Sequence, residues 1–230
     1  MRHLGTWSPR AGVLVVLACT AGCFPAVMHG AHIEEGWIAG VTAATTSGDT
    51  HTEGDEGGIY LRQAMIGPFV GYGSASSSPA QPGYYIGAVV PVIYPFAQID
   101  AYLELPPGLT RPVATGVGVT ASAESVHGYA MVGADFNRTT SWYVAGGYGS
   151  RRPGDEYRTP SPVWFGNAGI IRAYGYLRTQ LFVEYAAGRI PGSCFDDPVT
   201  GVRTCNQGGR ARAFSAGISL GRHQSNTGNR

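Results

Sequence analysis

Two runs near the end of the chain decide its fold: Gln-Leu-Phe-Val-Glu-Tyr-Ala-Ala-Gly-Arg (180–189) and Ala-Arg-Ala-Phe-Ser-Ala-Gly-Ile-Ser-Leu-Gly-Arg (211–222). In each run, apolar side chains alternate with small or polar ones. The apolar faces comprise Leu181, Val183, Tyr185 and Ala187 in the first run, and Phe214, Ala216, Ile218 and Leu220 in the second. A period of two is typical of β-strands, and an apolar outside with a tight or polar inside predicts a barrel wall.

The composition agrees with such a wall. Charged residues make up 13% of the chain, about half the share of an ordinary soluble domain, and there are 35 glycines. This indicates strands whose outer faces do not meet water. The formal net charge of +1 provides no field that favours nucleic acid, so no nucleic-acid partner is expected.

The same alternation recurs along most of the chain. It predicts strands at 36–47, 59–73, 83–94, 97–105, 113–122, 126–136, 141–150, 163–177, 180–190 and 211–222. No run has a helical period, so we expect an all-β fold, a single up-and-down antiparallel barrel of 8–10 strands over residues 36–222, followed by a polar tail at 223–230. Pro91 and Pro95 make the third run a poor member of a sheet.

The connections between these runs alternate in length. With the first strand starting on the periplasmic side, the outer connections include three long polar ones at 48–58, 151–162 and 191–210. The opposite connections are shorter. These features resemble the small bacterial outer-membrane β-barrel proteins, a resemblance that implies the bacterial outer membrane as location and its lipid as partner, with the three long loops as the surfaces for a ligand or a protein. The polar tail after Leu220 departs from the aromatic end that such barrels usually carry.

The first 22 residues read as a secretory signal, with Arg2 and Arg10 before the short apolar run 11–18. Thr20-Ala-Gly-Cys23 then resembles the lipobox of bacterial lipoproteins. That resemblance implies cleavage before Cys23, a diacylglycerol on its sulfur and a fatty acid such as palmitate on the new amino terminus. A box ending at Cys19 and an ordinary signal peptide remain as alternatives. Residues 23–35 are expected to be a solvated tether, in which His29 and His32 complete no metal site.

The other two cysteines, Cys194 and Cys205, lie in the longest outer loop. In an oxidising compartment this pair predicts a disulfide that closes the loop. A metal site is the weaker alternative, because the loop contains no histidine.

Several polar residues are expected inside the barrel as a salt-bridge network: Asp100, Glu104, Asp135, Arg172 and Glu184. Aromatic residues near strand ends suggest interfacial girdles: Trp37, Tyr60, Tyr72, Tyr84, Tyr85, Tyr94, Trp142, Tyr143 and Trp164. Ser125 and His127, beside Glu124, suggest a nucleophile with its base, but no catalysis, cofactor or metal is expected.

The sequence therefore predicts a lipid-anchored outer-membrane barrel with a structural or surface-interaction role. The alternative from another class is a soluble, lipocalin-like lipoprotein barrel that binds a small apolar ligand, and a lipid-modifying barrel enzyme is a distant third. The first two differ in the direction of the aliphatic side chains. Leu181, Val183, Ile218 and Leu220 point outward in a membrane barrel and inward in a soluble one.

Overall fold

The structure is a computed structural model. It describes residues 27–52, 59–75, 80–92, 97–106, 113–122, 125–151, 161–190, 193–196, 203–206 and 209–224. None of these residues forms a helix long and apolar enough to cross a membrane.

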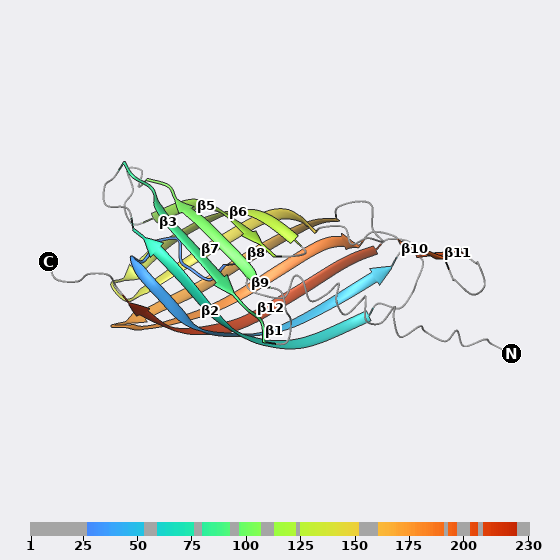
Figure 1. Cartoon of the computed structure of the whole chain (residues 1–230), viewed down its shortest axis with the longest axis horizontal. Coiled ribbons are helices and arrows are strands. Elements are labelled where there is room, and N and C mark those ends of the chain that lie inside the picture. The colour runs from blue at the N-terminus through green and yellow to red at the C-terminus, as the bar shows by residue number, and fades with distance from the viewer. Residues whose placement is uncertain are drawn as a thin grey trace.

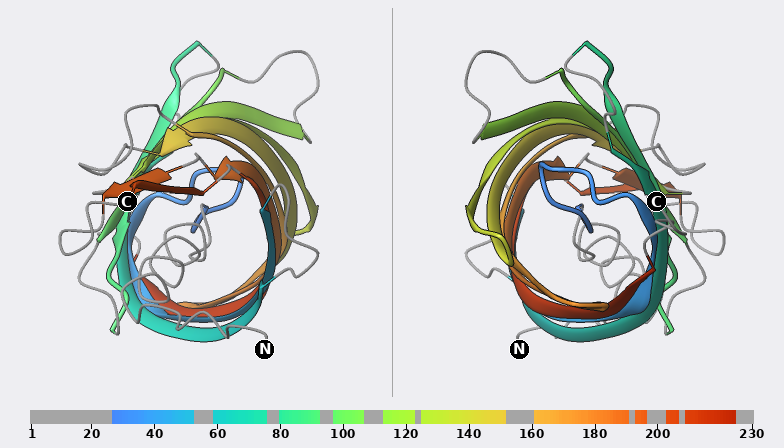
Figure 2. Two further views of the ribbon diagram at one scale, coloured as in Figure 1. Left: turned by 90° about the vertical axis from the view of Figure 1, so that its right-hand side faces the viewer. Right: turned by 90° about the vertical axis from the view of Figure 1, so that its left-hand side faces the viewer.

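Ten antiparallel strands close into one barrel (Figures 1 and 2). They are β1 (Gly36–Thr52), β2 (Ile59–Ser74), β3 (Gly83–Val89), β4 (Gln98–Glu104), β5 (Val113–Ala121), β6 (Ser125–Asn137), β7 (Thr140–Arg151), β8 (Ser161–Tyr174), β9 (Leu177–Ile190) and β12 (Gly209–Gln224). Each strand pairs with its neighbours in the chain, and the circle is closed between β1 and β12. The predicted all-β, up-and-down barrel is therefore confirmed, with ten strands.

The seam of the barrel is its longest pairing. β1 and β12 stay in register from Trp37 opposite Gln224 to Thr52 opposite Gly209. On its other side β12 pairs with β9, from Arg222 opposite Leu177 to Gly209 opposite Ile190. The runs 180–189 and 211–222 are thus neighbours in the wall, and neither leaves an unpaired edge.

The alternation of side chains sorts them between the outside and the lumen. Leu181, Val183, Ile218 and Leu220 point outward and are between 39% and 54% exposed, whereas Phe182, Glu184 and Ser219 point inward and are buried. The aliphatic residues therefore lie on the face that a membrane barrel requires. The inward packing expected of a soluble, lipocalin-like barrel is not what the structure has.

The two ends of the barrel differ. The turn end, on the left in Figure 1, carries the two-residue connections 138–139 and 175–176 and the start of β1. The loop end, on the right, carries the connection between β9 and β12. That connection contains a small hairpin of β10 (Ser193–Asp196) and β11 (Arg203–Asn206), which the sequence did not predict.

Several predicted boundaries were wrong, and two of them lie beside a glycine or a proline. The eighth and ninth runs were expected to meet at 178–179, but the turn lies at Gly175 and Tyr176, where Gly175 has a φ of 57°. The third run was expected to reach residue 94, but β3 ends at Val89. Beyond it, the amides of Val90 and Val92 still donate to the carbonyls of Pro68 and Ile66, on either side of Pro91, which has no amide hydrogen.

Candidate functional site

The lumen is filled by large aromatic side chains that lie over glycines. The side chain that a substitution would add at Gly118 meets the ring of Tyr129 on the paired position of β6. Gly169 stands in the same relation to Tyr143, and Gly217 to Phe182. A side chain added at Gly116 meets the ring of Tyr102 of β4, which lies two positions along that strand from the residue paired with Gly116. These glycines provide the flat surface on which the rings rest.

The segment before β1 forms a plug inside this lumen. Figure 2 shows residues 27–35 running within the ring of strands before Gly36, whose φ of 121° turns the chain into β1. Val27, Met28 and Ala31 are 3% exposed or less, and Ile33 is also buried. The solvated environment expected here was therefore wrong. The segment's apolar residues are covered because the wall encloses them, and we call residues 27–35 the plug.

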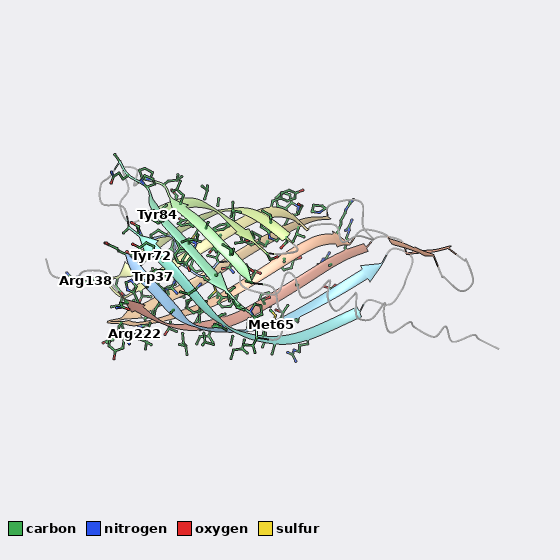
Figure 3. The ribbon with its side chains drawn as sticks, in the orientation of Figure 1. Trp37, Met65, Tyr72, Tyr84, Arg138 and Arg222 are labelled. Atoms are coloured by element: carbon green, nitrogen blue, oxygen red, sulfur yellow. The ribbon has the colours of Figure 1, made fainter. Side chains whose placement is uncertain are left out.

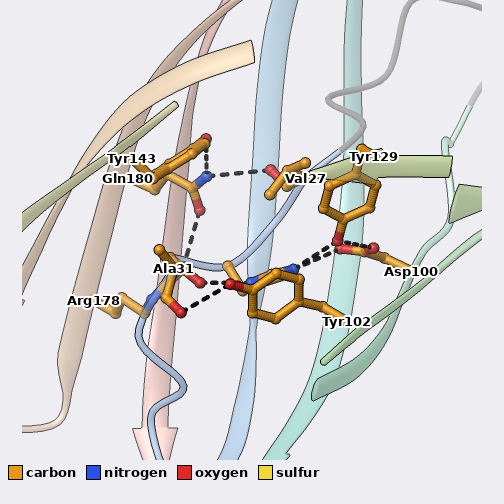
Figure 4. Close-up of polar contacts among 10 residues, drawn as sticks. Val27, Ala31, Asp100, Tyr102, Tyr129, Tyr143, Arg178 and Gln180 are labelled. Atoms are coloured by element: carbon orange, nitrogen blue, oxygen red, sulfur yellow. Dashed lines mark hydrogen bonds and ion pairs between the residues drawn. The ribbon is translucent and has the colours of Figure 1, made fainter. Parts of the chain in front are cut away.

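His29 lies at the centre of the contacts that hold the plug (Figure 4 shows its surroundings). Its ring packs between Tyr85 and Tyr102, with centroids 4.5 and 4.4 Å away. Its Nε2 lies 3.0 Å from the hydroxyl of Tyr129 and 3.3 Å from Oδ2 of Asp100. Tyr129 in turn donates to Oδ1 of Asp100 at 2.8 Å. A buried carboxylate of the wall is thereby paired with the plug.

Further contacts fix the plug along its length. Gln180 donates to the hydroxyl of Tyr143 at 2.7 Å and to the carbonyl of Val27 at 3.3 Å. Tyr102 donates to the carbonyl of Ala31 at 3.1 Å. Near the turn end the wall contributes charges to the plug: Glu104 accepts from the amide of Ile33 and lies 3.3 Å from His32, and the buried Arg178 lies 3.6 Å from Glu34.

The predicted interior network is only partly where the sequence placed it. Asp100 and Glu184 are buried in the lumen, and Glu104 lies near its rim. Glu184 accepts a hydrogen bond from Asn167 at 2.9 Å, apart from the plug.

The other two members were misplaced. Arg172 points outward, and its guanidinium carbon lies 5.9 Å from the ring centre of Tyr174. The adjacent Ile171 is the residue of β8 that faces the plug. Asp135 is exposed at the turn end, where its closest basic partner in the described chain is His32 at 3.9 Å. The sequence missed Arg178, Gln180 and the plug itself.

The outside of the barrel carries an apolar belt, which we call the outer belt. It consists of exposed aliphatic side chains from β1 to β12, including Val41, Ile66, Val70, Ile86, Ile99, Leu103, Val117, Val119, Val132, Val144, Ile170, Leu181, Val183, Ile218 and Leu220. Among the side chains that the structure describes, charged residues on the outer wall occur only toward the two ends. An apolar band between two polar ends is typical of a barrel that crosses a bilayer.

Aromatic residues border the outer belt. At the turn end Trp37 packs against Tyr72, which packs against Tyr84, with centroids 5.1 and 6.4 Å apart (Figure 3). Toward the loop end Tyr148 packs against Trp164 at 4.4 Å. The predicted girdles were wrong for Tyr85 and Tyr143, which are buried inside. Tyr94 lies outside the described residues, as does the side chain of Tyr60.

The suggested nucleophile and base do not come together. The hydroxyl of Ser125 lies 3.1 Å from that of Ser122, while the ring of His127 meets Phe165 edge-on at 5.8 Å. Glu124 lies outside the described residues. In the part of the chain that the structure describes, no group of three or more His, Cys, Asp or Glu side chains could hold a metal ion.

The two cysteine predictions stay predictions. Cys19 and Cys23 lie outside the described residues, as do the side chains of Cys194 and Cys205. The backbone nevertheless pairs Cys194 of β10 directly opposite Cys205 of β11.

No protein-family model and no curated protein matches the chain. Among solved structures, it is similar to the outer-membrane protease OmpT from Escherichia coli, with a TM-score of 0.43 and 6% identity over 82% of this chain and 96% of that one. It is also similar to the NanC porin (TM-score 0.40, 7% identity, 77% and 98%) and to the outer-membrane protein OprG from Pseudomonas aeruginosa (TM-score 0.39, 12% identity, 86% and 100%). At these values the comparisons assign no function.

Proposed function

We propose that this chain is a lipid-anchored β-barrel of the bacterial outer membrane, with a structural or surface-interaction role and no catalytic one. The outer belt is the observation that carries the proposal. Its aliphatic side chains cover the wall between two aromatic borders, and water would leave all of them exposed. Lipid is the solvent in which such a surface is stable.

Insertion of single arginines tests the belt. Leu181→Arg places a charge in the middle of the outer belt, and we expect it to destabilise the barrel in lipid vesicles by about 2–4 kcal/mol. The matched control is Tyr176→Arg, at the exposed turn between β8 and β9, where the loss is a ring contact with Arg222 at 5.2 Å, so we expect it to cost clearly less than Leu181→Arg. Folded barrel is measured by its anomalous migration in cold detergent gels. If Leu181→Arg folds as well as the control, or folds without lipid, the membrane proposal fails.

The lipid anchor at Cys23 rests on the resemblance of residues 20–23 to a lipobox. The intact mass of the mature protein tests it directly, because diacylglycerol and palmitate add a mass that Cys23→Ser removes. An unmodified mature chain would leave an ordinary secreted barrel and refute the anchor alone.

The role at the surface is assigned to the outer loops at 48–58, 151–162 and 191–210. The register of Cys194 opposite Cys205 supports a disulfide within the longest loop, since directly opposed strand residues have Cβ atoms close enough for one. Mass spectrometry of a non-reduced digest tests this bond. Two free thiols in the secreted protein would refute it.

A further inference from the structure

The outer wall near the loop end carries a cluster of arginines. Arg62 on β2, Arg189 on β9, and Arg210 and Arg212 on β12 are all exposed and point outward. We call these four residues the arginine patch. One carboxylate, Asp49, lies among them directly opposite Arg212 and is partly buried.

The strand registers bring these side chains together. Arg189 is directly opposite Arg210, and Arg212 is two residues further along β12. Arg62 lies in line with Phe214, which is two residues beyond Arg212 on β12, and Ser47 of β1 lies between Arg62 and Phe214. With strands about 4.8 Å apart and residues about 3.4 Å apart along a strand, the patch extends roughly 20 Å from Arg189 to Arg62.

Part of this arrangement is unfavourable without an anion. Like charges directly opposite each other on neighbouring strands destabilise a sheet. Arg189 and Arg210 form such a pair. An anion between the two guanidinium groups would convert this repulsion into two charge-assisted hydrogen bonds, and phosphate matches the donor geometry of arginine.

The tilt of the strands fixes the height of the patch. Residues that lie directly opposite one another on successive strands form a row around the barrel. One such row begins at the turn end with Leu177 of β9 and continues through Arg222, Ala39 and Val70. It ends near the loop end with Ser150 and Pro162. Rows therefore climb toward the loop end in the order β9, β12, β1, β2. For a tilt of 35–45°, each step along a row climbs about 3 Å and each residue along a strand about 2.5 Å.

Trp164, Ala187 and Arg212 share one row, so Arg212 lies about 6 Å beyond the ring that borders the outer belt. The same geometry places all four arginines roughly 5–11 Å beyond Trp164. Aromatic residues mark the level at which acyl chains give way to headgroups. The patch is therefore at headgroup level, where lipid phosphates lie.

We propose that the arginine patch binds the phosphate group of a lipid headgroup in the leaflet around the loop end. This proposal rests on the proposed function, since only a barrel that spans lipid presents the patch to headgroups. The competing partners are the chain's own Glu53, Asp55 and Glu56, in the connection between β1 and β2.

Native mass spectrometry of the refolded barrel with phosphatidic acid tests the proposal. Diacylglycerol, the same lipid without its phosphate, is the lipid control, and inorganic phosphate is the soluble one. We expect phosphatidic acid to bind and diacylglycerol not to bind. We expect the double variant Arg189→Gln/Arg210→Gln, which removes the directly opposed pair, to weaken binding about tenfold or more.

The matched protein control is Arg172→Gln/Arg222→Gln, which removes two outward arginines at the turn end. We expect it to bind phosphatidic acid as the unmodified chain does. Equal weakening in both double variants, or binding only after Glu53, Asp55 and Glu56 are changed to glutamine, would overturn the proposal. Inorganic phosphate that competes at equal concentration would show a free-anion site instead. All variants are first scored for folding in vesicles, because failure there counts against the membrane barrel and not against the patch.

Discussion

His29 has an oxygen atom within hydrogen-bond distance of each ring nitrogen. Nδ1 lies 2.7 Å from the carbonyl oxygen of Gly30, which can only accept. Nε2 faces the hydroxyl of Tyr129, whose own hydrogen is directed to Asp100. A donor at Nδ1 satisfies the Gly30 carbonyl, and Nε2 is the nitrogen that faces the Tyr129 hydroxyl and the Asp100 carboxylate. The plug is held to the wall by this buried pair of His29 and Asp100, whose Nε2 and Oδ2 lie 3.3 Å apart.

Asp100→Asn removes the charge of this pair and keeps the size of the side chain. We expect it to lower the free energy of unfolding by about 1–3 kcal/mol, because a charged hydrogen-bond acceptor is lost in a buried site. Urea titration of the barrel in vesicles measures it. Glu35→Gln, at an exposed carboxylate of the same plug, is the control and should be nearly neutral. Equal effects of the two substitutions would show that the pair adds nothing.

The glycines under the lumenal rings provide a second prediction. A methyl group at Gly118 overlaps the ring of Tyr129, so we expect Gly118→Ala to destabilise the barrel by about 1–3 kcal/mol through overpacking. Gly128→Ala is the control, because Gly128 points outward on β6 and nothing lies within 4 Å of its added methyl group. Thermal melting in detergent compares them. If both substitutions are equally tolerated, the ring does not rest on the glycine.

Single residues also show why the lumen could be predicted only in part. Tyr84 and Tyr85 are adjacent aromatics, as are Trp142 and Tyr143, and one member of each pair must face each side of the wall. Nothing in the residue types says which member faces the lumen. Ile170 and Ile171 are adjacent and equally apolar, so the sequence does not show which of them faces the lumen. For that reason Arg172 was wrongly predicted to lie inside the barrel.

At the scale of elements, alternation over about ten residues was enough to predict all ten strands. It could not predict their ends. β1 runs to Thr52 rather than 47, and β12 begins at Gly209 rather than 211, because the wall continues beyond the outer belt, where both faces are polar.

The plug has no period, so a linker was the natural interpretation. The available signal was chemical: Val27, Met28 and Ile33 are apolar residues in a supposedly solvated tether, and a lumenal Asp100 needs a partner.

The turn between β8 and β9 yields a third prediction. Gly175 has a φ of 57°, and no atom lies within 4 Å of an added side chain, so the backbone alone opposes substitution. Gly175→Val should cost about 1–2 kcal/mol, because β-branched residues avoid left-handed conformations. Gly175→Asn should cost clearly less, since asparagine tolerates them. Urea midpoints in vesicles rank the two variants. A midpoint for the valine variant equal to that of the asparagine variant would contradict a left-handed turn residue.

At the scale of the whole molecule, the plug connects the barrel wall with the proposed lipid anchor, because it lies between Cys23 and β1 in the chain. Gln180 holds the carbonyl of Val27, and β9 begins three residues earlier, at Leu177. The start of the plug therefore lies roughly 8 Å inside the turn end. Cys23 is four residues before Val27, which span about 14 Å at full extension. A fully extended chain from Val27 would therefore have only about 6 Å left beyond the turn end with which an acylated Cys23 could pass the rim and reach lipid.

The plug and the anchor should therefore oppose each other in the acylated protein. We expect a Gly-Ser-Gly-Ser insertion between Pro25 and Ala26 to raise the melting temperature of the acylated barrel, because the longer linker lets the plug seat without strain. In the Cys23→Ser protein, which has no anchor, the same insertion should leave the melting temperature unchanged. A second insertion in the polar sequence after Ser225 controls for added length. If the linker insertion has the same effect with and without Cys23, the anchor does not pull on the plug, and the two features are independent.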